Sequence, residues 1–374
     1  MSQTERPTAL IFRRRLLPWS ETFIAEQGGA LRRYRPVFVG YDREPGGAAY
    51  LEGRTVVLSS EHATVPAMAK ALLKAARALT PRWRAALASY QPRLLHAHFG
   101  TNAVDAIGIA RTFDIPLVVT YHGSDIAIER SRLALRRRAR VFRAAERIIA
   151  VSEFIAAKLL DAGCPPVKLT VHHIGVDTER FAPAAAPREP ATILFVGRLV
   201  PKKGLAHLLR AMRLVRDRVP AATLLVVGDG PLRSELEALA ARVEPGAHFL
   251  GVQEPARVRA LMRRATVLCA PSVVTRQGDA EGLPMTIVEA QASGLPVVAF
   301  PSGGSAEGIV HGETGFVAPP RDEAALADYL VQVLADPVTR ERFATTARAR
   351  ALAEFDLTEQ TRRLERIYDE ARGL

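Results

Sequence analysis

Residues 191–212 read ATILFVGRLVPKKGLAHLLRAM and carry the pattern on which the predicted fold rests. An apolar run at 192–196 is followed by a loop that begins at Gly197, and the loop leads into a stretch of helical composition. Strands of uninterrupted apolar residues are typical of parallel sheets that are covered on both faces. The stretch therefore predicts one strand–loop–helix unit of an α/β protein.

The same alternation continues on both sides of this unit. Apolar runs of strand length are separated by stretches rich in Ala, Leu and Arg that are long enough for helices. In order, the runs are 8–12, 37–40, 55–58, 94–98, 116–121, 147–151, 192–196, 222–227, 248–250, 266–270 and 296–300. Such repetition predicts an α/β fold with doubly wound, Rossmann-like domains built on parallel sheets.

A proline-rich run interrupts the alternation near the middle of the chain. Residues 181–190 read FAPAAAPREP, and three prolines in ten residues fit neither a helix interior nor a strand. The run predicts a linker between an N-terminal domain at 1–185 and a C-terminal domain at 188–356. Because doubly wound domains bind ligands at the carboxyl ends of their strands, we expect the two domains to face each other across a cleft.

Composition excludes several classes of protein. Of the 374 residues, 48% are hydrophobic and 24% are charged, which is typical of a globular chain. Cys164 and Cys269 have no CxxC spacing, so a disulfide scaffold and a cysteine-rich zinc site are excluded and a reducing, cytoplasmic environment is favoured. No apolar run is long enough for a membrane-spanning helix, and the run at 9–12 is too short for a signal peptide.

Positive charge is concentrated in the first half of the chain. The formal net charge is +12, and residues 1–187 hold 27 basic and 16 acidic side chains against 24 and 23 in residues 188–374. This asymmetry favours an anionic partner of the first half, either nucleic acid, an anionic membrane surface or a phosphorylated substrate.

Two features of the first half favour the membrane surface among these partners. Basic residues recur at helical spacing, and the segment RRRLLPW at 13–19 joins cations to apolar side chains. The basic residues at helical spacing are Arg132, Arg136, Arg140, Arg143 and Arg147. The alternative is a solvated, arginine-rich helix that has no partner.

Cations and glycines follow two predicted strands of the second half. Arg198 and Lys203 lie between the strand at 192–196 and the next helix, where two cations and free backbone N–H groups suit a diphosphate. The segment GDGP at 228–231 follows the strand at 222–227, and its glycines let the backbone approach a ligand closely. The alternatives are chance cations in a solvated loop and an ordinary strand–helix turn.

Two glutamates flank a turn in the segment EGLPMTIVE at 281–289. Pro284 predicts the first residue of a helix, so Glu281 lies in the loop before the helix and Glu289 lies one to two turns inside it. Backbone N–H groups at such a helix start can hold an anion or sugar hydroxyls. The alternative is a helix-capping Glu281 and a surface Glu289.

In this order and spacing, the motifs of the second half resemble the donor-binding domain of retaining family-4 glycosyltransferases, which have the GT-B fold. The resemblance continues through AQASGLPVV at 290–298, the glycines at 303–304 and GETG at 312–315, and it covers about residues 90–370. It implies a hexosyltransferase whose co-substrate is a nucleotide-diphosphate sugar, with UDP or GDP as the nucleotide.

The resemblance also implies roles for individual residues. Arg198 and Lys203 would neutralise the donor diphosphate, and fixed cations stabilise the charge that a leaving diphosphate gains. Glu281 would contact the transferred sugar, and Glu289 would hold the ribose hydroxyls. The other implied contacts to the sugar and the nucleoside are Gly228, Gly230, Val252, Gly282, Leu283 and Pro284.

Two motifs of the first half resemble the acceptor domain of the same family. LLHAHFG at 94–100 and VVTYHGSD at 118–125 each end a predicted strand. The resemblance puts the imidazole of His122 near the donor sugar, with His98 and Asp125 as neighbouring site residues. His96 and His98 could instead be metal ligands, but no carboxylate or cysteine is in register with them, so a structural role is favoured.

The segment PWSETFI at 18–24 departs from the family pattern. Many members have a Gly-Gly loop here, and this chain resembles instead the Ser-Glu-Thr-Phe variant of bacterial exopolysaccharide-type members. The hydroxyls or amides of Ser20 and Thr22, beside Glu21, would then supply the phosphate contacts. An alternative that is compatible with this is a helix that Ser20 caps and that extends through Ala30.

The sequence therefore predicts a retaining glycosyltransferase of bacterial exopolysaccharide or glycolipid assembly that acts on a lipid-linked or anionic acceptor. No Asp-x-Asp motif occurs, so Arg198 and Lys203 are expected to replace a metal ion in a cofactor-free, metal-independent reaction. The alternatives are transfer to a soluble small-molecule acceptor and a sugar-nucleotide epimerase on the same fold.

Three further expectations concern partners and organisation. Aromatic residues are only 6% and no nucleic-acid motif occurs, which argues against nucleic acid as a partner. The resemblance implies that a last helix, at about 357–374, packs back on the N-terminal domain. We expect a cytoplasmic protein that is peripheral at the inner face of the membrane if the basic surface binds lipid.

Overall fold

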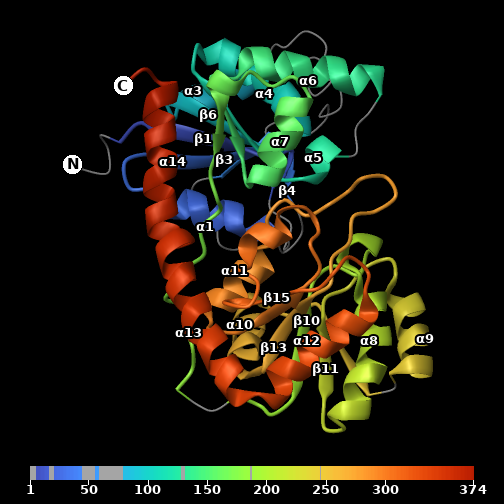
Figure 1. Cartoon of the computed structure of the whole chain (residues 1–374). Helices are drawn as coiled ribbons and strands as arrows, with labels where there is room; N and C mark the ends of the chain where they lie inside the picture. The colour runs from blue at the N-terminus through green and yellow to red at the C-terminus, as the bar shows by residue number, and fades with distance from the viewer. Residues whose placement is uncertain are drawn as a thin grey trace. The chain divides into compact units, whose positions relative to one another are not determined.

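The computed structural model describes residues 6–16, 21–43, 55–58, 79–127, 131–185, 188–244 and 246–374. The chain divides into two compact units, unit 1 with Met1–Gly175 and Leu357–Leu374, and unit 2 with Val176–Asp356 (Figure 1). Each unit contains a parallel sheet surrounded by helices. The prediction of two doubly wound, Rossmann-like domains is confirmed.

Unit 1 is built on a seven-stranded sheet in the order β5-β3-β1-β6-β7-β8-β9, and all neighbouring strands are parallel. The strands are β1 (Thr8–Phe12), β3 (Arg35–Gly40), β5 (Thr55–Val57), β6 (Pro92–His98), β7 (Leu117–Tyr121), β8 (Arg147–Ala150) and β9 (Leu169–Val171). A separate parallel pair joins β2 (Arg15–Leu16) to β4 (Asp42–Arg43). The helices are α1 (Thr22–Ala30), α3 (Pro81–Ala88), α4 (Gly100–Phe113), α5 (Ser124–Ala127), α6 (Arg132–Ala144), α7 (Glu153–Asp161) and α14 (Leu357–Ala371).

Unit 2 is built on a six-stranded parallel sheet in the order β12-β11-β10-β13-β14-β15. The strands are β10 (Thr192–Val196), β11 (Thr223–Val227), β12 (Ala247–Gly251), β13 (Val267–Ala270), β14 (Val297–Ala299) and β15 (Gly315–Val317). The helices are α8 (Leu205–Arg218), α9 (Arg233–Val243), α10 (Pro255–Arg264), α11 (Met285–Ala292), α12 (Glu323–Ala335) and α13 (Pro337–Glu354).

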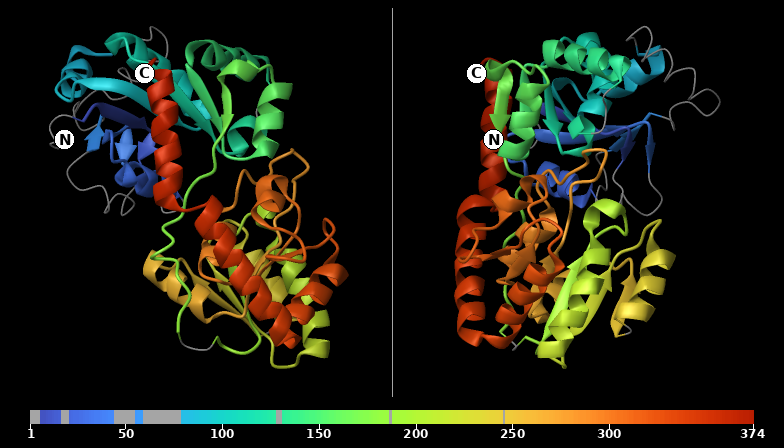
Figure 2. Two further views of the ribbon diagram at one scale, coloured as in Figure 1. Left: turned by 60° about the vertical axis from the view of Figure 1, so that its left-hand side comes forward. Right: turned by 45° about the vertical axis from the view of Figure 1, so that its right-hand side comes forward.

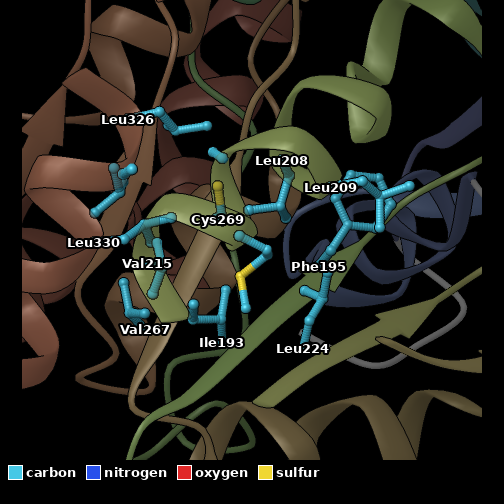
Figure 3. Packing of buried hydrophobic residues seen from close by; sticks show 14 of the residues in the cluster. Ile193, Phe195, Leu208, Leu209, Val215, Leu224, Val267, Cys269, Leu326 and Leu330 are labelled. Atoms are coloured by element: carbon cyan, nitrogen blue, oxygen red, sulfur yellow. The ribbon is translucent and has the colours of Figure 1, made fainter. Parts of the chain in front are cut away.

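The core of unit 2 lies between its sheet and the helices α8 and α12. On α8, the apolar residues that recur at helical spacing on one face are buried: Leu205, Leu208, Leu209, Met212 and Val215. Figure 3 shows Leu208, Leu209 and Val215 of α8 with Leu326 and Leu330 of α12, packed among strand residues that include Ile193, Phe195 and Val267. Burial of one such side chain contributes roughly 1.5–3 kcal/mol to the free energy of unfolding. This layer therefore holds α8 and α12 against the sheet, and with them the loops that lead into these helices.

Helix α14 lies along unit 1 although it follows unit 2 in the sequence (Figure 2). Glu365 accepts hydrogen bonds from the backbone N–H groups of Arg32 and Arg33 at 2.7 and 2.6 Å. The hydroxyl of Tyr34 donates to Asp369 at 2.7 Å. These bonds come from the segment after α1, so they bind both ends of the chain into one unit.

The structure corrects several boundaries. The change of unit falls at Gly175–Val176, before the proline-rich run that predicted it. Strands β9 and β15 were not predicted, and both are only three residues long. Helix α6 ends at Ala144 because Ala145 is extended, so Arg147 belongs to β8 and does not extend the basic helical face. Among the described residues, no helix has the length and apolar character that crossing a bilayer requires.

Candidate active site

The loops of unit 2 that follow β10 and β11 meet at the carboxyl edge of the sheet. The N–H of Leu199 donates to the carbonyl of Asp229 at 2.9 Å, and the N–H of Gly197 donates to that of Val227 at 3.0 Å. Gly228 has φ +129°, and a Cβ at this position would lie 1.9 Å from the carbonyl oxygen of Gly197. Only glycine therefore lets the predicted phosphate loop and the GDGP turn pack this closely.

Lys203 and Glu281 form an ion pair at the same edge. Lys203 Nζ lies 2.8 Å from Glu281 Oε1, and the Ser272 hydroxyl donates to the same oxygen at 2.9 Å. Burial by itself raises the pKa of Glu281, but the charges of Lys203 and Lys202 and the two hydrogen bonds outweigh it and leave the pKa below its usual value. The site thus holds a carboxylate that stays ionised inside the protein.

A second ion pair braces the first. Lys202 Nζ lies 3.1 Å from Asp279 Oδ1, and the N–H of Val273 donates to the carbonyl of Lys202 at 2.7 Å. The loop after β10 is therefore tied twice to the long loop after β13. The sequence analysis missed Lys202, Asp279 and Ser272, although Lys202 adjoins Lys203 and Asp279 lies two positions before Glu281.

The other predicted donor residues of unit 2 differ in exposure. The side chain of Arg198 is exposed, and Val252 is 63% exposed after the end of β12. Gly282, Leu283 and Pro284 are buried, and Pro284 caps α11 instead of being its first helical residue, which is Met285. Glu289 is half-buried in the second turn of α11. Gly230 lies in the turn after β11, against the backbone of Leu199.

The segment GGS at 303–305, which follows β14, contacts the backbone of Glu281. The N–H of Gly304 donates to the backbone carbonyl of Glu281 at 3.0 Å. The hydroxyls of Ser302 and Ser305 are buried without a hydrogen-bond partner in the described part of the chain. Loops that follow three strands, β10, β13 and β14, thus meet at the backbone and side chain of Glu281.

In unit 1, His98 and His122 lie at the carboxyl ends of the neighbouring strands β6 and β7. His98 Nδ1 is 3.1 Å from His122 Nε2, and the rings are 5.3 Å apart between centroids. Burial lowers the pKa of His122 to about 3, with help from His96 and the Arg13 charge, and burial likewise holds the pKa of His98 well below its usual value. Both imidazoles are therefore neutral at physiological pH.

Asp125 fixes the backbone around these histidines. Its carboxylate accepts hydrogen bonds from the N–H groups of His122 at 3.1 Å, Gly123 at 2.9 Å and Gly100 at 2.7 Å. A Cβ on Gly100 would lie 2.0 Å from the Tyr121 ring, so glycine is needed where α4 begins. Burial raises the pKa of Asp125 although the three backbone bonds lower it. Asp125 acts on the site through the backbone of its neighbours.

Glu21 is paired with Arg13 in a two-pronged contact. Arg13 Nε and Nη2 each donate to a Glu21 oxygen at 2.8 Å, and the Arg13 guanidinium lies over the Phe99 ring at 4.5 Å. Glu21 occupies the N-cap position of α1 and makes no capping bond, and Thr22 is the first helical residue. The helix therefore does not begin after a capping Ser20, and Ser20 lies outside the described residues.

His96 has partners that account for its burial. Its Nδ1 lies 2.7 Å from the Tyr368 hydroxyl of α14, and its Nε2 lies 2.7 Å from the Thr120 hydroxyl. In the described ranges, no three His, Cys, Asp or Glu side chains gather as a set of metal ligands. These contacts are those expected for the structural role that the sequence predicted for His96.

Two family models match the chain. "Glycosyltransferase Family 4" matches residues 20–180, and "Glycosyl transferases group 1" matches residues 176–350. The chain is 32% identical over 277 residues to the putative colanic acid biosynthesis glycosyltransferase WcaL of Escherichia coli, which is 71% of this chain and 66% of WcaL. It is 30% identical over 258 residues to the amylovoran biosynthesis glycosyltransferase AmsK of Erwinia amylovora, which is 67% of this chain and 63% of AmsK. The matched regions thus fall just short of two thirds of either relative.

Solved structures show the same fold over almost the whole chain. The structure of Anabaena Alr3699/HepE in complex with UDP-glucose is similar with a TM-score of 0.78 and 20% sequence identity. The similarity covers 98% of this chain and 100% of that chain.

Proposed function

Because this chain belongs to the family-4 glycosyltransferases with the GT-B fold, we propose that it transfers a hexosyl-type sugar from a nucleoside-diphosphate sugar to an acceptor hydroxyl. The reaction proceeds with retention and serves exopolysaccharide or glycolipid assembly. The observation that carries the proposal is the ion pair between Lys203, which is partly buried, and Glu281, which is buried, at the carboxyl edge of the second sheet. The relatives named for colanic acid and amylovoran support the pathway class, and UDP-glucose in the structural neighbour supports the donor class.

The donor diphosphate is assigned to Arg198 and Lys203. When the sugar leaves, the diphosphate gains negative charge, and a cation that is already in place stabilises that charge without reorganisation. Lys203 is held in place by Glu281, whereas Arg198 is exposed and can form a two-pronged contact with phosphate oxygens. Glu281, which remains ionised, can accept hydrogen bonds from hydroxyls of the transferred sugar.

The remaining residues orient the two substrates. Glu289 is assigned to the ribose hydroxyls, and His122 is assigned to the transferred sugar, which it positions through a neutral imidazole. In a retaining reaction of this kind, the leaving phosphate oxygen takes the acceptor proton on the same face. Further contacts to the nucleoside and the sugar are assigned to Gly228, Gly230, Val252, Gly282, Leu283 and Pro284.

Binding of nucleotide sugars tests this assignment of the donor. We expect UDP or GDP, free and as the sugar conjugate, to raise the melting temperature of the protein. The Arg198→Ala variant should melt normally but lose most of the shift, because the Arg198 side chain is exposed and, among the described residues, forms no hydrogen bond or ion pair. Arg213→Ala, another exposed arginine of unit 2, is the matched control. Absence of a shift with every nucleotide at millimolar concentration would contradict the donor class.

Activity is expected to survive a chelator. The chain has no Asp-x-Asp motif, and Arg198 and Lys203 supply the positive charge that a metal ion would otherwise bring to the diphosphate. Transfer measured in 5–10 mM EDTA (about the range that removes divalent ions) should equal transfer with added magnesium within about twofold. Loss of activity in EDTA that magnesium or manganese restores would refute metal independence.

Helix α6 is proposed as the surface that meets an anionic membrane or a lipid-linked acceptor. Its exposed side includes Leu133 and Leu135, which are 56% and 47% exposed, while Val141 and Phe142 are buried. The exposed arginines of α6 are Arg132, Arg136, Arg137, Arg140 and Arg143. Among the described residues, none of these five arginines meets a carboxylate in an ion pair.

In the segment at 13–19, two of the three predicted membrane cations are paired with carboxylates. Arg13 is bound to Glu21, Arg14 Nε lies 2.7 Å from Asp105, and Leu16 is fully buried. Leu17, Pro18 and Trp19 lie outside the described residues. The membrane proposal therefore rests mainly on α6.

Co-sedimentation with liposomes tests the membrane surface. Binding to vesicles that contain anionic lipid should exceed binding to neutral vesicles at low salt and fall at high salt. Arg136→Gln with Arg140→Gln should weaken it by about 2 kcal/mol, or about 30-fold, since each basic group contributes roughly 1 kcal/mol. Arg213→Gln with Arg242→Gln, which are exposed in unit 2, is the control. Equal, negligible binding to both vesicle types would favour a soluble acceptor.

A further inference from the structure

We propose that His98 is a positioning residue that holds the imidazole of His122 in one tautomer and one ring orientation. The contact that does this joins His98 Nδ1 to His122 Nε2 at 3.1 Å. The inference rests on the proposed function, because it specifies how His122 is prepared for the substrate. It also makes a claim about the free protein that can be tested without any substrate.

Adjacent parallel strands bring the two histidines together. His98 is the last residue of β6 and pairs in register with Thr120 of β7, and His122 comes directly after β7. The two ring planes are 25° apart. The side-chain amide of Asn102 donates to the backbone carbonyl of His98 at 2.7 Å, so His98 is itself anchored by the first turn of α4.

The other neighbours of His122 do not determine which of two flipped orientations its ring adopts. Asp125 fixes its backbone N–H, and the rings of Phe23 and Phe99 lie beside it with centroids at 5.3 and 4.4 Å. These contacts confine the ring, but a flip about the Cβ–Cγ bond would interchange a nitrogen and a carbon at each edge. A hydrogen bond from His98 distinguishes nitrogen from carbon, so it selects one flip state.

The same hydrogen bond also couples the tautomer of His122 to that of His98. Burial lowers the pKa of both rings, and at neutral pH each ring carries a single proton. One nitrogen of the pair must donate and the other must accept, so the position of the proton on one ring determines its position on the other. His122 Nε2 is occupied by His98, so Nδ1 is the nitrogen that remains for a substrate hydroxyl.

Three substitutions of His98 separate a positioning role from a packing role. Asn places an amide where Nδ1 lies, Gln places it where Nε2 lies, and Leu removes the hydrogen bond while filling the space. We expect kcat to fall between about 10- and 100-fold in His98→Gln and His98→Leu, because small misplacements of reacting groups have effects of that size. His98→Asn should recover most of the loss, and the KM for the donor should change less than kcat in all three variants.

Nitrogen NMR of the imidazoles reads out the tautomer directly. In the wild type and in His98→Asn, His122 should show one neutral tautomer above pH 7, and in His98→Leu it should show averaged signals of both. His172→Leu is the matched control. It removes another buried histidine of unit 1, whose Nε2 lies 2.8 Å from the Gln360 carbonyl, and should leave kcat and the His122 signals unchanged.

The outcomes distinguish this inference from the proposed function. Averaged tautomers of His122 in the wild type, or wild-type kcat in both His98→Gln and His98→Leu, would overturn the positioning role. If the wild type transfers no sugar, the proposed function fails, and the NMR comparison still decides the inference. If His98→Leu does not fold, the comparison of His98→Asn with His98→Gln decides it, because both side chains are polar amides.

Discussion

Lys203→Ala is expected to reduce sugar transfer between about 30- and 1000-fold, which corresponds to about 2–4 kcal/mol of lost transition-state stabilisation. The side chain of Lys203 is 20% exposed and is held 2.8 Å from Glu281. In the proposed reaction, it meets the charge that develops on the leaving diphosphate. Glu281→Gln should reduce kcat by a comparable factor, because the amide keeps the hydrogen bond from Ser272 but no longer fixes the ammonium group.

Melting temperatures and steady-state kinetics of the purified variants separate lost chemistry from lost structure. Lys168→Ala is the matched control, because Lys168 Nζ donates to backbone carbonyls that include those of Arg143 and Ala145 at 3.1 and 2.6 Å in unit 1. We expect this control to lose stability without losing kcat. Turnover within a few-fold of wild type in both Lys203→Ala and Glu281→Gln would reject the donor site.

Unit 1 is expected to lose about 5 kcal/mol of its free energy of unfolding when the pH falls from 7.5 to 5.5. Four of its histidines are buried with lowered pKa values, to about 3 for His122, to about 4 for His172, and well below the usual value for His96 and His98. For each pH unit below the pKa of a histidine in the unfolded chain, each of these histidines lowers the free energy of unfolding by about 1.4 kcal/mol.

The sign of this effect follows from which state takes up protons. Below about pH 6.5 the unfolded histidines bind protons and the folded ones do not, so the stability that is present above pH 6.5 is lost as the pH falls. In unit 2 the lowered pKa of Glu281 acts in the same direction, but only below the usual range of a glutamate. Unit 1 should therefore unfold first on acidification.

Urea unfolding followed by tryptophan fluorescence measures this loss. Both tryptophans, Trp19 and Trp83, belong to the first 175 residues, and the indole N–H of Trp83 donates to the Leu58 carbonyl at 2.7 Å in the core of unit 1. His172→Gln should reduce the pH dependence by about a quarter, since one of four buried histidines is removed. A free energy of unfolding that is equal at pH 7.5 and 5.5 would contradict the burial of neutral imidazoles.

Much of the fold could be predicted because parallel sheets have a simple sequence pattern. The strands at 8–12 and 192–196 have the predicted bounds, since uninterrupted apolar runs end abruptly at polar or glycine residues. β15 was missed because it is a three-residue strand that begins inside the glycine motif at 312–315. The basic helical face was overextended to Arg147 because periodicity alone does not register the extended Ala145.

Ion pairs between residues distant in the sequence were harder to predict than the edge of the sheet at which those residues lie. The sequence pattern placed both Lys203 and Glu281 in loops that precede helices of the C-terminal domain, but no spacing in the sequence indicates that they form an ion pair. Arg13 was interpreted as a membrane cation, yet Glu21 neutralises it. Which charges are paired depends on tertiary contacts, and a composition count cannot distinguish a paired arginine from an exposed one.

The central claim is transfer of a sugar from a nucleoside diphosphate to an acceptor, and the yields of both products in one reaction test it most directly. Extract from a polysaccharide-producing bacterium supplies the acceptor, and UDP- and GDP-sugars supply the donor. We predict that free nucleoside diphosphate and glycosylated acceptor form in a one-to-one ratio, with the anomeric configuration of the donor retained by NMR. Conversion of the nucleotide sugar to an isomer without release of diphosphate, or no consumption of any donor, would contradict the claim.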